Sequence, residues 1–525
     1  MLAHIVLAPL VLFAALRSVR LVKNYLTARK FGLPIILLPV SFEDLWWIPL
    51  RPLFSWVERL PFGLGNWYLY TEMGWPMIDG NRSVLRYGEN FVLCAPSGIQ
   101  IATAYGPGLE HVLKNHKSWP QPGAQSQLFA FYGQNVTSTN GAEWQRHRKI
   151  TATAFNENSM REVWTDAVER TKQLDLPTKQ DRSLKEIRST FDILAMSLGF
   201  ILDNVFLTVA TNGVTSVPDY LLPKTLLRLK VSLNEFKKYM EEFVLHQMRL
   251  SNQEGIKSRT KSLLEGMVNA NEAEKRSGDN RFTKQYLSES ELYGNLFVFN
   301  LAGFETTAST MTFALSYLAG NIHVQEWVTE EVDQHYTNSD DRDYEKVYPK
   351  LVRCLAVMHE TLRLASPAPL LVRTPTIVDE IPVITATGEK SIAIPPGVMV
   401  GMNGYGAHLS PRWGHDADKF NPSRFVTSSE KGEESLRVPD IGMFLPWLGG
   451  SRVCPGKKFS QVEFVAIVAQ ILSHYRIEPL LKWGEDDETA RHRLLSVLDD
   501  KFFHVSAHLK RPDDAGVRFV PRMRA

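Results

Sequence analysis

The chain has 525 residues, of which 44% are hydrophobic and 22% charged, and its formal net charge is +2 at pH 7. These values exclude a disordered, collagen-like or multi-span membrane protein, and the near-neutral charge gives no overall field for nucleic acid. The three cysteines, Cys94, Cys354 and Cys454, are too sparse for a disulfide framework, which favours a reducing compartment.

The N-terminus begins with an apolar run. Residues 2–16 are interrupted only by His4 and Pro9, and as a helix they would span about 22 Å, short of the roughly 30 Å hydrocarbon core. A cleavable signal peptide carries its positive charge before the run, whereas here the basic residues follow it. They are Arg17, Arg20, Lys23, Arg29 and Lys30. We predict an uncleaved membrane anchor over residues 1–30, with a buried first helix as the alternative.

Residues 31–60 are rich in proline and large apolar side chains. Proline at this density excludes a regular helix, so we predict a stiff membrane-proximal connector whose apolar side chains rest on the bilayer. No repeat or long linker divides the rest of the chain, and we predict one domain over residues 61–525.

Most of that domain has the pattern of helices. The clearest case is residues 288–320, where Ser288 and Glu291 match a capping box and a long apolar run follows. Clusters of Val, Ile and Thr near residues 88–103 and 370–400 predict small sheets. The polar stretch 252–284 favours a loop region with a short amphipathic helix near residues 263–268. The predicted fold class is mainly α with small β-sheets.

The strongest chemical signal is the segment Trp-Leu-Gly-Gly-Ser-Arg-Val-Cys-Pro-Gly, which runs from Trp447 to Gly456. Gly450 and Gly456 on either side of Cys454 let the backbone approach a flat group and leave the sulfur unencumbered. Arg452 supplies a cation for a carboxylate. A lone axial thiolate pushes electron density onto haem iron. A buried inert thiol is the usual alternative, but this spacing after an aromatic residue is seldom met by chance.

The segment resembles the haem-binding loop of cytochrome P450 enzymes, whose usual pattern is Phe-x-x-Gly-x-Arg-x-Cys-x-Gly. This chain departs from the pattern at its first position, where Trp447 replaces phenylalanine. The resemblance implies the P450 fold, with a long central helix over the haem and the thiolate loop beneath it. It implies haem as the cofactor, with Cys454 as the axial iron ligand and Trp447 packed against the ligand loop.

Two further motifs resemble the family. In Glu360-Thr-Leu-Arg363 the two charged residues share a helix face, and the family locks such a pair with a later arginine, here Arg424. A solvated pair on a helix is the alternative. The segment 302–307, Ala-Gly-Phe-Glu-Thr-Thr, places Glu305 and Thr306 in the long apolar run, where polar groups are costly unless paired. It resembles the oxygen-activation motif, which implies that both deliver protons. A threonine bonded to the carbonyl four residues back is the alternative.

Propionate-binding residues are implied next. Trp144 and Arg148 share a helix face, and the resemblance implies that both reach a haem propionate. Arg373 matches another propionate arginine, with an ordinary strand-edge arginine as the alternative. Together with Arg452, three arginines would face two carboxylates.

The resemblance covers about residues 60 to 512 and implies a haem-thiolate monooxygenase in domain 61–525. It would insert one atom of O2 into a lipophilic small molecule with electrons from NADPH through a reductase. Anchoring in the endoplasmic reticulum membrane and a cytosolic catalytic domain are implied as well. One alternative is a haem-thiolate isomerase or dehydratase, which NADPH-dependent turnover would exclude. Another is a non-enzymatic haem sensor, which a response confined to CO or NO would support.

The substrate is indicated only by class. Residues that line the pocket by position are apolar, which favours a lipophilic substrate such as a fungal terpenoid or polyketide, although each could be ordinary core. They are Phe129, Phe131, Phe297, Phe299, Ala302, Ala368, Leu370, Leu371, Phe502 and Phe503. We expect the reductase to dock near Lys457, Lys458, Arg146 and Lys149, unless the two lysines are merely solvated at a helix start. The resemblance is weakest over residues 197–225.

Overall fold

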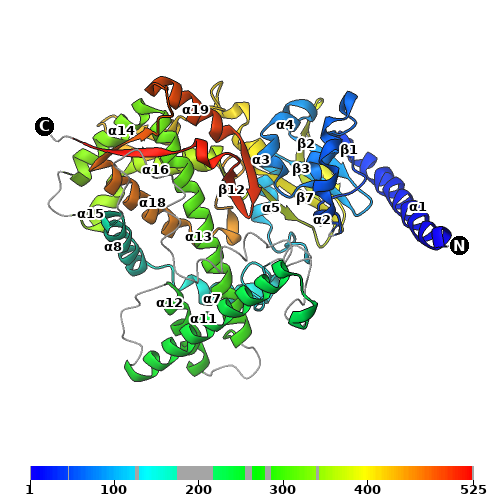
Figure 1. Cartoon of the computed structure of the whole chain (residues 1–525), viewed down its shortest axis with the longest axis horizontal. Coiled ribbons are helices and arrows are strands. Elements are labelled where there is room, and N and C mark those ends of the chain that lie inside the picture. Colours follow the sequence, from blue (N-terminus) through cyan, green and yellow to red (C-terminus); the bar gives the residue numbers. More distant parts are fainter. Residues whose placement is uncertain are drawn as a thin grey trace.

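The computed structural model describes residues 2–44, 46–123, 129–173, 217–254, 263–277, 285–337 and 342–522. Figure 1 shows a helical body around the long α13 and a sheet-rich region beside it, from which the N-terminal helix extends. The helical body contains most of the buried residues, so the predicted fold class, mainly α with small sheets, is confirmed.

The largest sheet has five strands in the order β1-β2-β3-β7-β4. These are β1 (Ile35–Leu37), β2 (Asn90–Cys94), β3 (Ile99–Thr103), β7 (Val398–Asn403) and β4 (Leu370–Arg373). β2 and β3 are antiparallel, as are β4 and β7, whereas the β1–β2 and β3–β7 pairs are parallel. Every residue of β2 and β3 is buried, in keeping with their apolar sequences. The predicted strands near residues 88–103 and 370–400 are confirmed.

Smaller antiparallel pairs complete the β structure. They are β5 (Asp379–Thr385) with β6 (Gly388–Ile394), β8 (Val426–Ser428) with β9 (Glu434–Leu436), β10 (Tyr475–Pro479) with β13 (Val517–Pro521), and β11 (Lys501–His504) with β12 (Ser506–Leu509).

The central helix is α13 (Glu289–Gly320), and the predicted capping box is present. The Ser288 side chain accepts a bond from the Glu291 backbone, and the Glu291 side chain accepts one from the Ser288 backbone. The helix packs against α16 (Val352–Leu364), α18 (Lys457–Leu472) and α19 (Asp487–Asp499) around one large apolar core. Its run of apolar residues therefore reflects burial on several sides.

Other helices pack on this core or on the neighbouring core clusters. They are α3 (Trp75–Asp79), α4 (Arg82–Tyr87), α5 (Gly106–Lys114), α7 (Gly141–Ala152), α8 (Glu157–Gln173), α14 (Ile322–Val332), α15 (Tyr344–Val347) and α17 (Gly404–His408). Of these, α5 packs on the cluster beside the main sheet.

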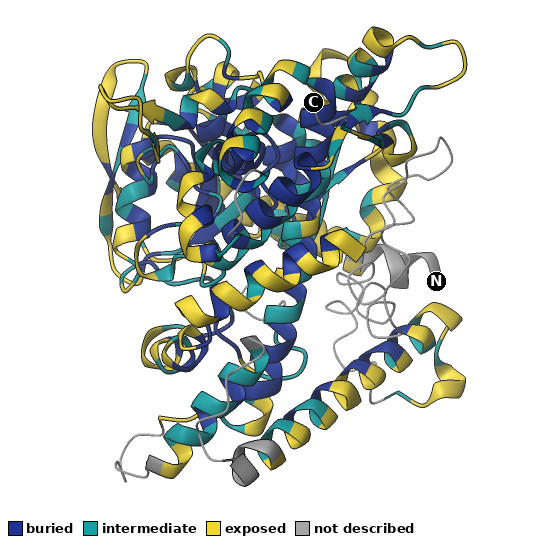
Figure 2. Cartoon of the chain, turned by 90° about the vertical axis from the view of Figure 1, so that its left-hand side faces the viewer, coloured by how far each residue is buried: buried dark blue, intermediate teal, exposed yellow. Residues whose placement is uncertain are grey.

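A second layer of helices lies at the lower end of Figure 1. α11 (Lys224–Glu254) contacts α12 (Leu263–Ser277) and α13, and Figure 2 shows alternating buried and exposed faces on the long helix there. The short helix predicted near residues 263–268 is real but extends to Ser277, and in the extension the buried Asn271 side chain accepts a hydrogen bond from the Leu287 backbone. Residues 255–262 and 278–284, and the weakly matching stretch up to residue 216, lie outside the described residues.

The N-terminal helix α1 (Leu2–Ala28) extends from the body in Figure 1 and exposes a row of large apolar side chains. They are Val11, Leu12, Phe13, Leu16, Val19, Val22 and Leu26. Its second half is docked, since Leu21, Tyr25 and Ala28 pack on a core cluster and Arg17 pairs with Asp44 at 2.7 Å. Among the described residues no helix combines the length and the apolarity needed to cross a membrane.

The proline-rich segment has little regular helix, as predicted. It contains β1, the single turn α2 (Trp47–Leu50) and the 3-10 helix η2 (Arg51–Arg59), and another 3-10 helix, η4 (Asn66–Thr71), follows it. Several apolar side chains of this part of the chain are exposed, including Leu53, Trp56 and Phe62. Because β1 pairs with β2, the segment also contributes a strand to the main sheet.

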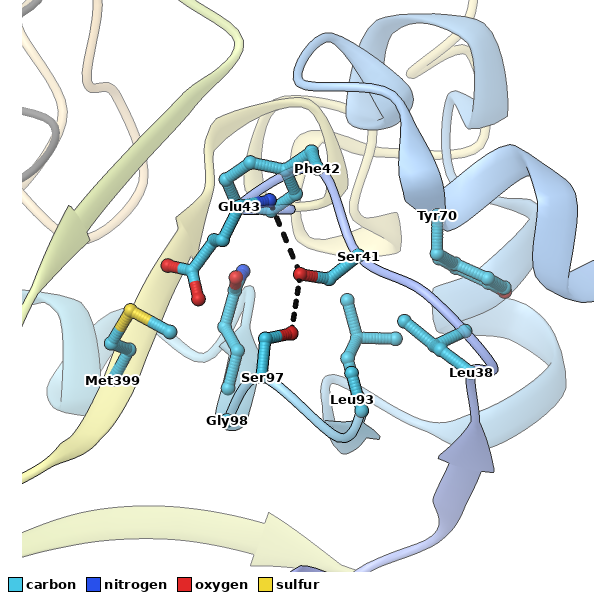
Figure 3. Close-up of a pocket in the computed structure, with 11 residues that line it drawn as sticks. Leu38, Ser41, Phe42, Glu43, Tyr70, Leu93, Ser97, Gly98 and Met399 are labelled. Carbon is cyan, nitrogen blue, oxygen red and sulfur yellow. Dashed lines mark hydrogen bonds between the residues drawn. The ribbon is translucent and has the colours of Figure 1, made fainter. Parts of the chain in front are cut away.

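A small cavity lies where this segment meets the sheet (Figure 3). Ser41 Oγ and Ser97 Oγ lie 2.8 Å apart on its wall, and the Glu43 backbone N–H donates to Ser41 Oγ. Burial, followed by the neighbouring charge of Asp44, raises the pKa of Glu43 to about 7. The space of about 10 Å³ suffices for about one water molecule, so this cavity is not a substrate site.

α7 is fastened to the start of α13 by an ion pair. Arg146 donates two hydrogen bonds to the Glu291 carboxylate, at 2.6 and 2.9 Å, and Asn295 Nδ2 lies 2.8 Å from the buried His147 ring. Burial favours a raised pKa for Glu291, but the bonds from Arg146 and Ser288 outweigh it and hold the pKa well below 4.5. The carboxylate therefore stabilises the fold in its charged form.

Replacing Glu291 with glutamine should lower stability at neutral pH by about 2 kcal/mol, because charge-assisted bonds to Arg146 are lost. A depressed folded-state pKa contributes stability above the unfolded value of 4.5, and this is lost as the pH falls. The difference in thermal midpoint between wild type and Glu291→Gln should thus shrink below pH 4.5. Glu274→Gln is the control, since its partner Lys149 is exposed; an equal loss in both variants would contradict the argument.

Candidate active site

The loop of Cys454 precedes α18 and is held by its own backbone. The Cys454 N–H donates to the Trp447 carbonyl at 2.8 Å, which closes the loop. Gly450 has φ +63°, and a Cβ there would lie 2.6 Å from the Leu113 carbonyl, so this position requires glycine for the turn and for its contact with the end of α5. A Cβ on Gly456 would have Phe155 and the Cys454 sulfur as neighbours, at 3.8 and 3.9 Å.

The thiol of Cys454 differs from the two other thiols. Cys94 and Cys354 are buried, whereas Cys454 is exposed. The protein around the thiol still desolvates it and raises its pKa, against the lowering effects of the Gly456 N–H and the charges of Arg148 and Lys457. Cys454 therefore lies within the body yet presents its side chain to an open space.

Trp447 is buried behind this loop. Its indole N–H donates to Ser460 Oγ at 3.2 Å, and its ring lies 5.1 Å from the ring of His359. Lys457 Nζ lies 5.5 Å from the same ring. The indole N–H that comes with tryptophan in place of the usual phenylalanine thus has a hydrogen-bond acceptor on α18.

Three arginines near the loop have no acidic partner among the described residues: Arg148, Arg373 and Arg452. Arg373 is buried on β4, where it donates to the Val372 carbonyl and leaves Nη2 without a partner. Burial, and then the charge of Arg452, lowers the pKa of Arg373 to about 10. A buried cation, Arg373, beside a partly buried one, Arg452, is costly unless an anion joins them.

Arg452 is positioned by α7 and the segment before it. Its Nη2 donates to the Thr139 carbonyl and to Asn140 Oδ1, while Nε has no partner. Its guanidinium stacks on the Trp144 ring at 4.6 Å, and burial lowers its pKa to about 10. The His116 ring also lies beside the Trp144 ring, and its buried Nδ1 has no hydrogen-bond partner. The structure thus brings Trp144, Arg373 and Arg452 into one cluster whose positive charge favours an anion.

The middle of α13 is uncovered. Ala302, Gly303 and Ala308 are exposed although the residues around them are mostly buried. A Cβ added to Gly303 would meet no described atom within 4 Å. The Thr306 hydroxyl donates to the Ala302 carbonyl at 2.6 Å, the local bond that was the alternative expectation for this threonine. This stretch of α13 is therefore open to a bound group.

Glu305 is held by β12. Its Oε1 lies 3.0 Å from His508 Nε2 and accepts a hydrogen bond from Ser506 Oγ at 3.1 Å. The glutamate that the sequence places in an apolar helix is thus buried and paired.

Glu360, Arg363 and Arg424 form one buried cluster, as the sequence predicts. Arg363 donates two bonds to Glu360, at 2.7 and 2.8 Å, and Arg424 Nε donates to Glu360 Oε1 at 3.0 Å. Arg363 also donates to the carbonyls of His408 and Ala417. The cluster joins α16 to the segment before the thiol loop.

Comparison with known proteins decides the family. The cytochrome P450 family model matches residues 201–502, more than half of the chain. This chain belongs to the cytochrome P450 family. A P450 monooxygenase of the phomenoic acid biosynthesis cluster of Leptosphaeria maculans is 27% identical over 94% of this chain and 95% of its own length. Cytochrome P450 monooxygenase ORF6 of Penicillium roqueforti is 26% identical, with 92% of each chain covered.

The fold agrees with this assignment. A zebra fish cytochrome P450 solved with progesterone superposes with a TM-score of 0.60 at 16% identity, covering 85% of this chain and 99% of that one. The chain is a P450 monooxygenase with haem as its cofactor. The residues present fit that group: an exposed thiol on a glycine loop, an uncovered helix face and three arginines without acidic partners.

The pocket candidates of this P450 differ in how far they are buried. Ala302 and Ala368 are exposed within buried segments, which suits residues that face a ligand. Phe297 is enclosed by Phe131 and Tyr132, with ring distances of 5.7 and 5.0 Å, and is ordinary core. Phe503 is partly buried and packs against Gly74 and the edge of the large core cluster. The remaining six candidates, Phe129, Phe131, Phe299, Leu370, Leu371 and Phe502, are partly buried.

The predicted reductase surface needs one correction. Arg146 was expected to be a free surface charge, but it is bound to Glu291 and is largely buried because α7 packs on α13. Lys149 pairs with Glu274 at 2.7 Å. Lys458 is exposed and lies 4.3 Å from the Tyr348 ring, and Lys457 covers Trp447. Of the four residues predicted for this surface, Lys457 and Lys458 are the two for which no ion pair is seen among the described residues.

Sequence reasoning missed several residues of the site: His116, Asn140, His359, Ser506 and His508. The sequence does contain a signal for the last two. Ser506 and His508 are two residues apart, so they share one face of a strand, and a buried glutamate requires polar partners. The others lie close to the motifs but belong to no pattern of their own.

Proposed function

We propose that Cys454 is the axial ligand of the haem iron and that Arg373, Arg452, Arg148 and Trp144 bind the haem propionates. The observation that carries this proposal is the group of three arginines without acidic partners. Arg363, the other buried arginine among the described residues, is by contrast paired with Glu360. A dicarboxylate would neutralise Arg373 and Arg452, and indole and guanidinium N–H groups are suitable donors for it.

The bound haem supplies activation of O2 with electrons from a reductase. The roles of the protein follow from its own groups: the loop of Cys454 presents a thiolate, and the exposed face at Ala302 and Gly303 leaves room above it. Thr306 holds a hydroxyl beside that face, and Glu305 serves as the acid that replenishes its protons. An isomerase or a sensor would not need this acid, and the relatives named as monooxygenases further disfavour both.

The test is haem retention in Arg373→Gln and Arg452→Gln. Each change removes charge-assisted bonds to a propionate, so haem loss to a scavenging protein should accelerate about tenfold or more. The haem-free form of Arg373→Gln should keep its thermal midpoint, because Arg373 has no acidic partner among the described residues. Arg353→Gln is the control: Arg353 pairs with Glu434, so its loss should destabilise without speeding haem release selectively. Unchanged haem loss in both test variants would refute the propionate roles.

We also propose attachment to the endoplasmic reticulum membrane through the first half of α1 and the exposed apolar side chains of the proline-rich segment, which leaves the catalytic domain in the cytosol. The exposed row from Val11 to Leu26 supports this, and so does the basic stretch that follows residue 16. This extends the expected anchor over residues 1–30: from Arg17 onward the helix also contacts the body.

Deleting residues 2–16 should therefore release the protein from membranes with haem content and thermal midpoint retained. Deleting residues 2–30 should release it too but lower the midpoint, since it removes Leu21, Tyr25 and the Arg17–Asp44 pair, at a cost of about 1–3 kcal/mol. Sedimentation with microsomes and thermal unfolding check both. Equal midpoints in the two deletions would contradict the docking of α1.

For the substrate we propose a lipophilic small molecule of fungal secondary metabolism. The apolar candidates around the open face of α13 support it, and one relative is named for the phomenoic acid biosynthesis cluster.

A further inference from the structure

We propose that His508 is the residue through which Glu305 receives protons from solvent, with Ser506 fixing the carboxylate for the transfer. This rests on the proposed role of Glu305 as the acid of the oxygen site. His508 acts through Glu305 and is therefore a positioning and proton-supplying residue of the monooxygenase reaction.

The geometry begins with three polar groups from two distant parts of the chain. His508 Nε2 and Ser506 Oγ lie 3.0 and 3.1 Å from the same oxygen, Glu305 Oε1. Ser506 is fully buried and only 8% of the Glu305 side chain is exposed, whereas 21% of the His508 side chain is exposed. Of the three groups, His508 has the most exposed side chain, and it is the one that water can reach most easily.

The partners of His508 determine which ring nitrogen carries hydrogen. Nε2 lies 3.0 Å from a carboxylate oxygen and 3.1 Å from the His504 carbonyl, and a carbonyl can only accept. Nε2 therefore carries the proton and donates. Nδ1 forms no hydrogen bond with any residue that the structure describes, so it is the nitrogen that can take a proton from water.

The β11–β12 hairpin keeps this arrangement in place. His504 pairs with Ser506 and Phe502 with His508, and the Phe502 ring lies 5.5 Å from the imidazole. Val505 at the tip has φ +66°, which a β-branched residue adopts only when its surroundings hold it. It packs on the cluster that contains Leu301 of α13. Ser309 of α13 also donates to the Ala507 carbonyl at 2.6 Å, which fastens β12 to the helix.

The protons that pass through His508 and Glu305 balance those that the reaction consumes. Each insertion of one oxygen atom consumes O2, two electrons and two protons, and yields the product and one water. At each transfer the Nε2–H bond of His508 breaks and a bond forms between that proton and Glu305 Oε1, while Nδ1 binds a proton from water. Glu305 then gives its proton to the Thr306 side, and the imidazole returns to the Nε2–H form by exchange with solvent.

The test compares His508→Gln with wild type in the complete holoenzyme with reductase, NADPH and dissolved O2. Glutamine keeps an N–H that can hold Glu305 but cannot pass a proton on. Failure of proton delivery diverts electrons to H2O2, so H2O2 released per NADPH should rise, and the solvent isotope effect on NADPH consumption should increase. Thermal midpoint and the spectrum of the reduced CO complex should not change, which separates this role from a structural one. His492→Gln is the matched control, because this histidine on α19 has a side chain that is 78% exposed.

Three outcomes separate the possibilities. If Glu305→Gln raises H2O2 release and His508→Gln does not, Glu305 obtains its protons elsewhere and the proposal is overturned. If neither variant differs from wild type, the proposed function of Glu305 itself fails. Independently of turnover, ¹⁵N NMR of the histidine rings should show hydrogen on Nε2 of His508, with a shift when Glu305 is changed to glutamine; an Nδ1–H form with bare Nε2 also overturns it.

Discussion

Glu360→Ala should yield a protein that neither folds stably nor retains haem. The carboxylate, fully buried, accepts bonds from Arg363 and Arg424 and from the Asn421 backbone. Its removal leaves the guanidinium of Arg363 buried without its counter-charge, at a cost of about 3–5 kcal/mol. That is a large part of the roughly 5–15 kcal/mol that stabilises a typical protein. Haem absorbance per protein and the thermal midpoint measure the effect.

Two further variants test whether this loss comes from the charge and the burial of Glu360. Glu360→Gln keeps acceptor oxygen without the charge and should fall between wild type and alanine. Glu330→Ala removes a carboxylate that pairs with Arg353 at 3.2 Å but is 74% exposed, so it should change the midpoint little. Wild-type haem content in Glu360→Ala would contradict the structural role of this cluster.

Much of this site could be predicted from sequence because its parts are local. The turn at Gly450 and the loop to Cys454 lie within one short segment, and the capping box of α13 needs two residues three apart. Local patterns of this kind follow from backbone sterics and unsatisfied helix ends, whatever the rest of the chain does.

The contacts that were missed link distant segments. Glu305 and His508 are about two hundred residues apart in the chain, and Arg146 was taken for a surface charge because its partner Glu291 lies on another helix. Spacing along one helix can show that Arg146 shares a face with its neighbours, but not which helix covers that face. The N-terminal helix is similar: its apolar row is visible in the sequence, whereas the Arg17–Asp44 pair that orients it is not.

Cys454→Ser should abolish thiolate ligation with little effect on the folded chain. The residue is exposed and sits in a loop closed by its backbone N–H, which serine keeps. Cys94 and Cys354 are both buried, so neither thiol is placed to replace it as the ligand. Cys94→Ala is therefore the matched control and should bind haem as the wild type does. NADPH-dependent oxygen consumption should fall to background in Cys454→Ser alone.

The spectrum of the reduced protein with CO tests the central claim most directly, because thiolate ligation moves the Soret band to about 450 nm. We predict this band for wild type and Cys94→Ala and its loss in Cys454→Ser. A band that stays at that wavelength after Cys454→Ser, or that never forms in the wild-type holoprotein, would contradict the assignment of Cys454 as the haem ligand.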